Sequence, residues 1–175
     1  MAFFDFLRQN PAKLNKTGIK WYNRGEWDAA IMYFDQVISI DPNNSDAWYY
    51  KAKLLDHLKK RDDALIAVNK AIALNPTNLD ALGFKEGILR CSKKNYSEAI
   101  SICQDMLKID PNNLIALSGL AESYYRTANY EKSIELAKKC IKVLPSQAAP
   151  TDPRFQSTLL WAESFLSLSE EELRK

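Results

Sequence analysis

The side chains suited to nucleophilic or metal-assisted catalysis are few in this sequence, and they lie far apart. His57 is the single histidine, and Cys91, Cys103 and Cys140 are widely separated in segments with helical patterning. A nucleophile needs a base within hydrogen-bonding distance, and a metal needs clustered ligands. The sequence also lacks a glycine-rich phosphate loop after a strand and a G-x-S-x-G elbow. We therefore expect no enzyme activity, no metal and no cofactor.

Charge and composition narrow the classes of partner. The 175 residues carry a net charge of +2 with interspersed signs, so no nucleic-acid partner is expected. No stretch approaches the ~20 apolar residues of a membrane span, and the first residues lack the pattern of a signal peptide. The odd number of separated cysteines fits reduced thiols better than a disulfide framework. These features predict a cytoplasmic protein without an integral membrane segment.

A period of 34 or 35 residues defines the elements that must position any functional side chain. Pro42, Pro76, Pro111 and Pro145 are 34, 35 and 34 residues apart. Small residues keep the same step at Ala30, Ala64, Ala99 and Ser133, and a second series has Gly18, Ala52 and Ala121. Each interval has room for two short helices, and small residues let neighbouring helices approach closely. The period therefore indicates a stack of helix hairpins.

The turns between the intervals support this interpretation. The segments 41–44, 75–78 and 110–113 each place a proline where a helix should end, followed by an asparagine that can cap the next helix. Asn10-Pro11 begins the first interval in the same way. We expect each proline to close its segment.

These residues together resemble the tetratricopeptide repeat family, whose 34-residue pattern combines large apolar, small and aromatic positions with a final proline. The matching residues are Leu14, Gly18, Trp21, Ala30, Phe34, Val37 and Pro42, then Trp48, Ala52, Leu55, Ala64, Val68, Ala71 and Pro76, and later Leu117, Leu120, Ala121, Tyr124, Ser133, Ala137, Cys140 and Pro145. The resemblance implies an all-α, right-handed superhelical solenoid of helix-turn-helix repeats. The repeats would span 11–44, 45–78, 79–113 and 114–147, between an aromatic segment (1–10) and a linker with a C-terminal capping helix (148–175).

The third repeat contains one extra residue, which two alignments place differently. Aligning Leu89 with Leu55 puts it in the turn near 91–95, whereas aligning Gly87 with Gly18 puts it near Leu79. One residue rotates a helix by about 100°, so the choice decides which side chains share a face. We favour the insertion in the turn.

In this family the first helix of each pair lines a concave groove, which implies a non-catalytic interaction module or adaptor that binds a peptide or protein segment. The groove candidates, carried over position by position, are Asn15, Tyr22, Asn23, Tyr49, Lys53, His57, Gly83, Gly87, Arg90, Glu122, Tyr125 and Arg126. Tyrosines supply contact area, Asn and Arg bind backbone or carboxylate groups, and the glycines let a ligand approach closely. We expect Tyr49, Lys53, Tyr125 and Arg126 to contribute through exposed contacts rather than through folding.

Some co-chaperones of the family hold the acidic Glu-Glu-Val-Asp tail of heat-shock chaperones with a clamp of Lys, Asn and Arg. The corresponding positions here hold Asn15, Ile19, Tyr50, Gly83 and Gly87, which do not supply that set. A chaperone tail is therefore not an expected partner. RNA binding, suggested by the similar design of pentatricopeptide arrays, is disfavoured by the modest charge.

Each end of the chain suggests a further role. The aromatic segment holds Phe3, Phe4, Phe6 and Leu7, and a stripe near the C-terminus holds Phe155, Leu159, Ala162 and Leu166. The stripe predicts a helix that caps the last repeat. The aromatic residues either fold onto the first repeat, self-associate or contact a membrane surface. The alternative function is therefore a structural assembly protein that self-associates through one of its ends, and we expect a monomer or weak homo-oligomer.

Overall fold

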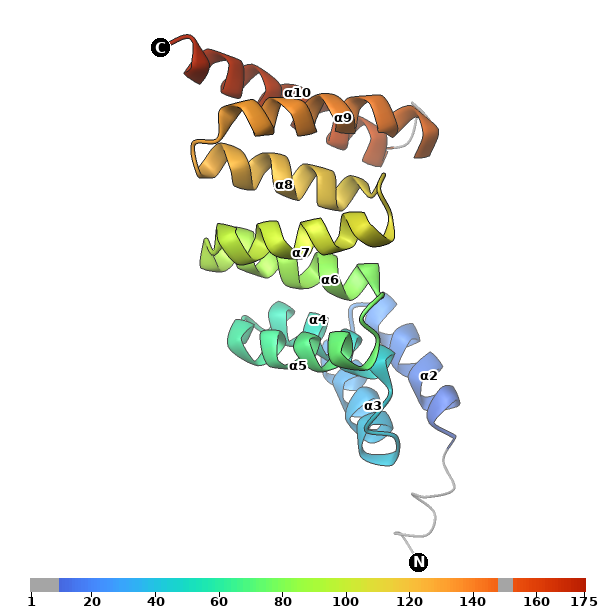
Figure 1. The fold of residues 1–175 in the computed structure, drawn as a ribbon. Coiled ribbons are helices and arrows are strands. Elements are labelled where there is room, and N and C mark those ends of the chain that lie inside the picture. Colours follow the sequence, from blue (N-terminus) through green and yellow to red (C-terminus); the bar gives the residue numbers. More distant parts are fainter. Residues whose placement is uncertain (1–9, 148–152) are drawn as a thin grey trace, which may run out of the picture. The chain divides into compact units, whose positions relative to one another are not determined.

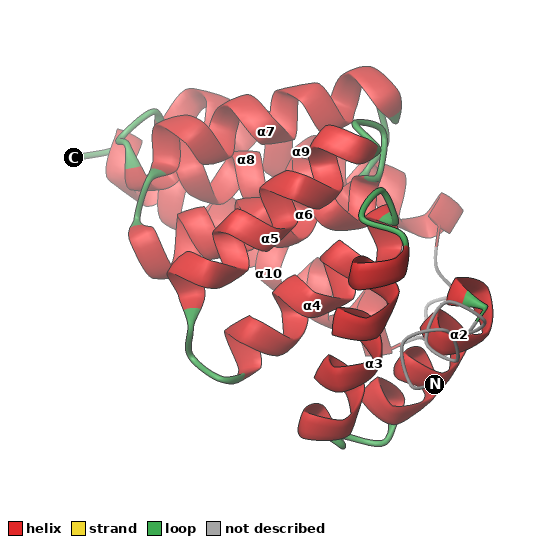
Figure 2. Ribbon diagram, turned by 90° about the horizontal axis from the view of Figure 1, so that it is seen from below, coloured by secondary structure: helices red, strands yellow, loops and turns green. Residues whose placement is uncertain are grey.

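The computed structural model describes residues 10–147 and 153–175, and these ranges contain helices and loops but no strand (Figure 2). The elements are α2 (Pro11–Asn23), α3 (Trp27–Ile40), α4 (Ser45–His57), α5 (Arg61–Leu74), α6 (Leu79–Gly87), the π-helical turn η1 (Ile88–Lys93), α7 (Tyr96–Ile109), α8 (Leu114–Arg126), α9 (Tyr130–Gln147) and α10 (Pro153–Leu173) (Figure 1). The predicted all-α helical repeat fold is confirmed. The aromatic cluster at Phe3–Leu7 lies outside the described residues.

The chain forms two compact units, Met1–Phe84 and Lys85–Lys175, with the boundary inside α6. In the first unit, α2 packs on α3 and α4 packs on α5, while α4 also contacts both helices of the preceding hairpin. In the second unit, α7, α8, α9 and α10 pack in succession, and α10 also reaches α8 (Figure 1). Each unit is thus built from helix hairpins, as the repeat pattern requires.

Asparagines start the first helix of each hairpin. The side-chain oxygens of Asn44, Asn78 and Asn113 each accept the backbone N–H three residues later, at 3.0 Å. Asn10 accepts the N–H of Ala12 at 2.9 Å, with Pro11 following it in the first turn. Each bond satisfies a backbone donor that has no partner inside the helix. The predicted caps are therefore present.

The turn inside each hairpin shows where the extra residue of the third repeat lies. A residue with positive φ ends the first helix, at Gly25, Lys59, Lys94 and Ala128. The next residue donates its N–H to a carbonyl five residues back in three hairpins (Glu26 to Trp21, Lys60 to Leu55, Asn129 to Tyr124) but six back in the third (Asn95 to Leu89). The extra residue is accommodated in η1, in agreement with the alignment of Leu89 with Leu55.

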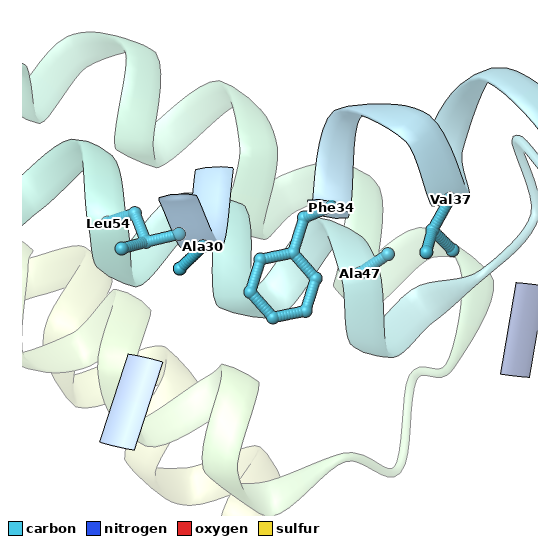
Figure 3. Packing of buried hydrophobic residues seen from close by; sticks show 5 residues of the cluster. All are labelled: Ala30, Phe34, Val37, Ala47 and Leu54. Carbon is cyan, nitrogen blue, oxygen red and sulfur yellow. The ribbon is translucent and has the colours of Figure 1, made fainter. Parts of the chain in front are cut away.

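Apolar side chains and small residues fill the centre of each unit. In the first unit the core contains Ala30, Phe34, Val37, Ala47 and Leu54, all fully buried (Figure 3). Ala30 and Ala64 from the small-residue series have no exposed surface, as close helix packing requires. The periodic small residues therefore mark helix contacts.

The helix α10 closes the second unit. Its Ala162 is buried in one cluster with Leu117 of α8 and Cys140 of α9. The buried Ser169 hydroxyl donates to the Ser133 hydroxyl at 3.0 Å, and Ser133 in turn donates to the Ala121 carbonyl at 2.9 Å. The predicted capping helix is confirmed, and a buried chain of hydroxyl groups fixes it to the last hairpin.

One proline behaves differently from the prediction. Pro42, Pro76 and Pro111 follow the ends of their helices, whereas α9 continues to Gln147, two residues beyond Pro145. An aspartate precedes both Pro42 and Pro111, and its side chain accepts a hydrogen bond from the backbone N–H of the residue after the proline. Asp41 accepts this bond from Asn43 at 3.2 Å. Leu144 before Pro145 has no such acceptor, so this turn is not formed and the expectation that Pro145 closes its segment was wrong.

Ala64→Leu should lower the free energy of unfolding by about 1 to 3 kcal/mol, because Ala64 is fully buried where α5 packs against its neighbours. Urea denaturation monitored by circular dichroism measures the effect. Ile66→Leu on the exposed face of the same helix is the control, for which we expect a change within about 0.5 kcal/mol. Equal midpoints for the two variants would contradict the assignment of Ala64 to a helix contact.

Candidate functional site

In the first unit, three tyrosines surround the ammonium group of Lys53. The Lys53 Nζ lies 4.6 Å from the ring centre of Tyr22, 5.4 Å from that of Tyr49 and 5.7 Å from that of Tyr50. Tyr49 and Lys53 are four residues apart and share a face of α4, while Tyr22 comes from α2. We call these four residues the tyrosine–lysine cluster.

The electrostatics of the tyrosine–lysine cluster keep Lys53 charged. Partial burial lowers the pKa of Lys53, but the interactions of its ammonium group with Tyr22, Tyr49 and Tyr50 outweigh this effect and raise the pKa overall. Ring faces also attract a cation electrostatically. The Lys53 ammonium group is therefore positively charged and is kept in place by the aromatic rings around it, at a partly exposed surface.

A second aromatic contact adjoins this cluster. The ring of His57, at the end of α4, stacks on Trp27 with centres 4.3 Å apart and an angle of 12° between the planes. Tyr22 touches both rings, at 5.5 Å from Trp27 and 6.2 Å from His57. His57 is therefore a surface residue that extends the aromatic area, as expected of a lone histidine near a helix end.

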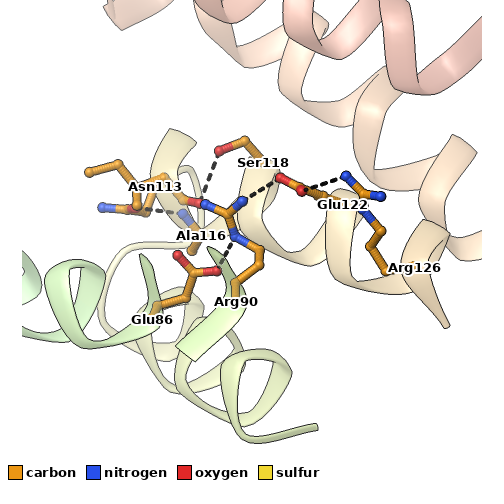
Figure 4. Close-up of polar contacts among 8 residues, drawn as sticks. Glu86, Arg90, Asn113, Ala116, Ser118, Glu122 and Arg126 are labelled. Atoms are coloured by element: carbon orange, nitrogen blue, oxygen red, sulfur yellow. Dashed lines mark hydrogen bonds and ion pairs between the residues drawn. The ribbon is translucent and has the colours of Figure 1, made fainter. Parts of the chain in front are cut away.

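In the second unit, two arginines and two glutamates form a connected network, the arginine–glutamate cluster (Figure 4). The Arg90 Nε donates to Glu86 Oε1 at 2.6 Å, and its Nη1 donates to Glu122 Oε2. Arg126 Nη2 lies 3.5 Å from Glu122 Oε1. The side chains of Glu86, Arg90 and Glu122 are only 1, 19 and 15% exposed. Charged side chains that are so little exposed to water need partners of opposite charge, and the residues of this cluster pair with one another.

Glu86 stands where the other repeats have a small residue. It follows Ala52 by 34 residues and precedes Ala121 by 35, in the register that η1 establishes. Gly119 of α8 leaves room for it, since a Cβ there would lie 2.7 Å from Glu86 Oε1. Burial raises the pKa of Glu86, and the Arg90 guanidinium partly opposes the rise. A buried carboxylate thus replaces a methyl group or hydrogen at a helix contact.

A pocket of about 320 Å³ opens beside the arginine–glutamate cluster, and we call it the α8–α10 pocket. Its lining comes from Arg90, from two residues of α8 and from three residues of α10: Ser118, Glu122, Ser157, Thr158 and Trp161. The Trp161 ring is held by Phe165, whose ring centre is 4.6 Å away. The capping helix therefore contributes one wall of this pocket, which combines polar groups with an indole ring.

The structure groups the predicted groove residues unevenly. Tyr22, Tyr49, Lys53 and His57 come together in the first unit, and Arg90, Glu122 and Arg126 in the second. The remaining candidates join neither cluster: Asn15, Asn23, Gly83, Gly87 and Tyr125.

Several of the groove candidates are only partly exposed. Tyr49 is half-buried, with its ring centre 6.2 Å from that of Phe84, and Arg90 and Glu122 are largely covered. Tyr125 packs against Phe165 of α10 with ring centres 5.4 Å apart, because the capping helix lies over that face of α8. The expectation of exposed contacts was therefore wrong for Tyr49 and Tyr125, which are partly covered.

Sequence reasoning missed three contributors to these sites. Tyr50 was matched only to a clamp position, and the α10 wall was expected only as a cap. Glu86 could have been noticed in the sequence. The favoured alignment places it at the repeat position of Gly18 and Ala52, where an acidic residue is unexpected.

The three cysteines differ in burial and in reactivity. Cys91 is an exposed free thiol, and Cys103 and Cys140 are buried ones. Burial raises the pKa of the Cys140 thiol to about 11 and that of Cys103 further, so both are poor nucleophiles. Among the residues that the structure describes, no group of side chains is suited to hold a metal and no helix is long and apolar enough to cross a membrane.

The chain belongs to the tetratricopeptide repeat family. The sequence model of that family matches residues 23–85 and 92–159, which is more than half of the chain. No curated protein matches the chain. Tetratricopeptide repeats generally mediate protein–protein interactions, and members of the family are generally non-catalytic.

Several solved structures are similar in fold. A MamA structure from Desulfovibrio magneticus RS-1 is 19% identical over 95% of this chain and 93% of its own, with a TM-score of 0.72. PilF of Pseudomonas aeruginosa is 17% identical over 92% of this chain and 75% of its own, with a TM-score of 0.71. At these identities the likeness concerns the fold alone. The first repeat domain of Spaghetti (RPAP3), bound to the HSP90 peptide SRMEEVD, is 25% identical over 67% of this chain and 95% of its own, with a TM-score of 0.63.

Proposed function

We propose that this chain is an interaction module or adaptor that binds a peptide or protein segment on the first helices of its repeats. The tyrosine–lysine cluster carries this proposal. Tyrosines offer large, amphipathic contact area with few rotatable bonds, and they are enriched at protein interfaces. Lys53 adds a charge that is already fixed in position, so little side-chain entropy is lost on binding.

The surface of α4 provides a matched pair of variants for testing this proposal. Lys53→Met keeps the side-chain length against the tyrosines but removes the charge. Lys51→Met makes the same change two residues away, where Lys51 pairs with Asp35 at 2.6 Å. Peptides selected from a random display library on the wild-type chain should bind Lys53→Met at least tenfold more weakly, about 1.4 kcal/mol, and bind Lys51→Met normally. Failure to select any peptide, or equal losses in both variants, would refute the proposal.

A Glu-Glu-Val-Asp peptide should bind no better than its scrambled control. The position of Ile19 lacks a polar group, and the arginines of the second unit already pair with Glu86 and Glu122. A clamp for two carboxylates needs cations whose N–H groups are free to donate to them. Isothermal titration calorimetry measures both peptides, and a low-micromolar affinity specific to the native order would contradict this prediction. RPAP3, which is similar in fold and holds SRMEEVD, is the positive control.

An open groove on the first hairpin favours a second candidate function, self-assembly. The groove between α2 and α3 has a volume of about 920 Å³ and is lined by the apolar side chains of Leu14, Trp21 and Met32 together with polar ones such as Lys13 and Gln36. Met32 is 63% exposed. Sedimentation velocity over a range of concentrations tests assembly, with Met32→Lys and a chain lacking residues 1–9 as variants. A wild-type chain that stays monomeric at every concentration eliminates this candidate.

A further inference from the structure

We propose that the α8–α10 pocket is a subsite for a carboxamide, the side chain of Asn or Gln in a bound peptide. The inference rests on the proposed function, because the peptide supplies the side chain. It begins from the arginine–glutamate cluster, which combines two guanidinium groups with two carboxylates beside a pocket. The cluster sets the chemistry that the pocket accepts.

The balance of charge selects a neutral ligand. A carboxylate entering the pocket would approach Glu122, and an ammonium group would approach Arg90. A ligand of either sign is attracted by one of these side chains and repelled by the other, which lies beside it. A carboxamide carries a hydrogen-bond acceptor and two donors without net charge. It therefore matches a wall that presents a guanidinium beside a carboxylate.

The hydrogen-bonding groups of the pocket are fixed before binding. The contacts of Arg90 Nε and Nη1 fix the plane of its guanidinium, and Nη2 takes part in neither. The Ser118 hydroxyl donates to the Ile115 carbonyl at 3.0 Å, so its oxygen is left to act as an acceptor at the pocket wall. We expect Arg90 to donate to the carboxamide oxygen and Glu122 or Ser118 to accept from its NH₂ group. Fixed groups lose little entropy when a ligand binds.

The remaining wall suits the methylene groups of such a side chain. Trp161 presents an indole that Phe165 supports, and Phe165 contacts Tyr125 in turn. The volume of about 320 Å³ is at the lower limit for ligand pockets, which run from about 300 to 1,000 Å³. The pocket is therefore sized for one side chain rather than a complete cofactor.

Glu86 acts on this subsite as a positioning residue. It does not line the pocket, but its carboxylate holds Arg90 from the buried side. Burying an ion pair often stabilises less than apolar residues of the same volume would. A glutamate at a position where the neighbouring repeats have Gly or Ala is therefore better explained by holding Arg90 than by stability.

The experiment uses the full chain and the peptides selected as described above. Their alignment should show one position enriched in Asn or Gln. One selected peptide is then synthesised with Gln at that position and with the isosteres Glu and Met, and calorimetry compares the three. We expect both substitutions to weaken binding at least tenfold. Glu122→Gln should reverse the discrimination between Gln and Glu peptides, because the repelling carboxylate is gone, while the exposed Glu131→Gln should leave it unchanged.

The outcomes separate this proposal from the proposed function. If no peptide is selected, the proposed function fails. If peptides bind but no position prefers Asn or Gln, or the Met peptide binds as well as the Gln peptide, the subsite alone is refuted. Should Glu122→Gln lower the melting temperature, Thr158→Phe fills the pocket from α10 without touching the ion pairs. That variant should bind the Gln and Met peptides equally, and retained preference for Gln would overturn the subsite.

Discussion

Replacing Arg90 with leucine should destabilise the protein by about 3 to 5 kcal/mol at neutral pH, because the change leaves the buried Glu86 carboxylate without its cation. Glu86 is almost completely buried, and its carboxylate accepts the 2.6 Å bond from Arg90 that Figure 4 draws. Arg126→Leu is the matched control, since Arg126 is 51% exposed and lies 3.5 Å from Glu122. An exposed pair of this kind contributes about 0 to 1 kcal/mol.

The pH dependence identifies Glu86 as the source of the loss. Burial raises its pKa above the ordinary value of 4.5, and the loss of Arg90 raises it further. A carboxyl group with a raised folded-state pKa contributes stability that is complete below its unfolded pKa and is lost as the pH rises through the folded pKa. The loss of stability in Arg90→Leu relative to wild type should therefore shrink as the pH falls from 7 towards the ordinary carboxyl pKa of 4.5.

A second substitution checks this interpretation. Glu86→Gln in the Arg90→Leu background removes the buried titrating group, so the difference in stability from wild type should depend much less on pH than it does for Arg90→Leu alone. Urea denaturation at several pH values measures all four proteins. A loss of equal size in Arg90→Leu and Arg126→Leu, or one that grows at low pH, would show that Glu86 is not held by Arg90.

Gly119→Ala should lower the free energy of unfolding by about 1 to 3 kcal/mol through overpacking, despite the gain in helix propensity of about 0.5 to 1 kcal/mol. The new methyl group would lie 2.7 Å from Glu86 Oε1 and 3.0 Å from Cys103 Sγ. The carboxylate cannot move away without leaving Arg90. Gly87→Ala is the control, because a Cβ there meets no atom within 4 Å and the backbone is helical.

A compensating change separates steric conflict from other effects. Glu86→Ala restores the small residue found at Ala52 and Ala121, so the double variant Glu86→Ala/Gly119→Ala should lose less than the two single changes added together. Thermal and urea unfolding of the four proteins give the coupling energy. Strict additivity would mean that Gly119 and Glu86 do not share the space that the structure assigns to them.

The repeat fold was predictable because its signals are local and periodic. The asparagine caps, the small residues and the interval of 34 or 35 each depend on neighbours along the chain, and the structure contains them. The error at Pro145 has a local cause too, since the turn needs the acceptor that Asp41 provides and Leu144 does not. The period alone does not contain that detail.

The binding clusters were predictable only in part, because they depend on which helices meet. The repeat positions place Tyr49 and Lys53 on one face, but nothing in the sequence says that Tyr22 of another helix completes the ring of aromatics. Likewise Arg90 and Glu122 were both candidates, and their pairing follows from the packing of η1 against α8 and from Glu86 behind them. The α10 wall required a contact between segments about 70 residues apart in sequence, which periodicity does not encode.

The turn at η1 shows where a repeat array of this kind can accept one extra residue. An extra codon inside a first helix would rotate every later side chain by about 100° and move Glu86 or its neighbours away from their contacts. In the turn between Leu89 and Asn95 the same codon only widens a loop, and the asparagine caps of the following helices keep their places. Hairpin turns are therefore the sites at which an array of this kind accepts a single-residue insertion without redesign of its helices.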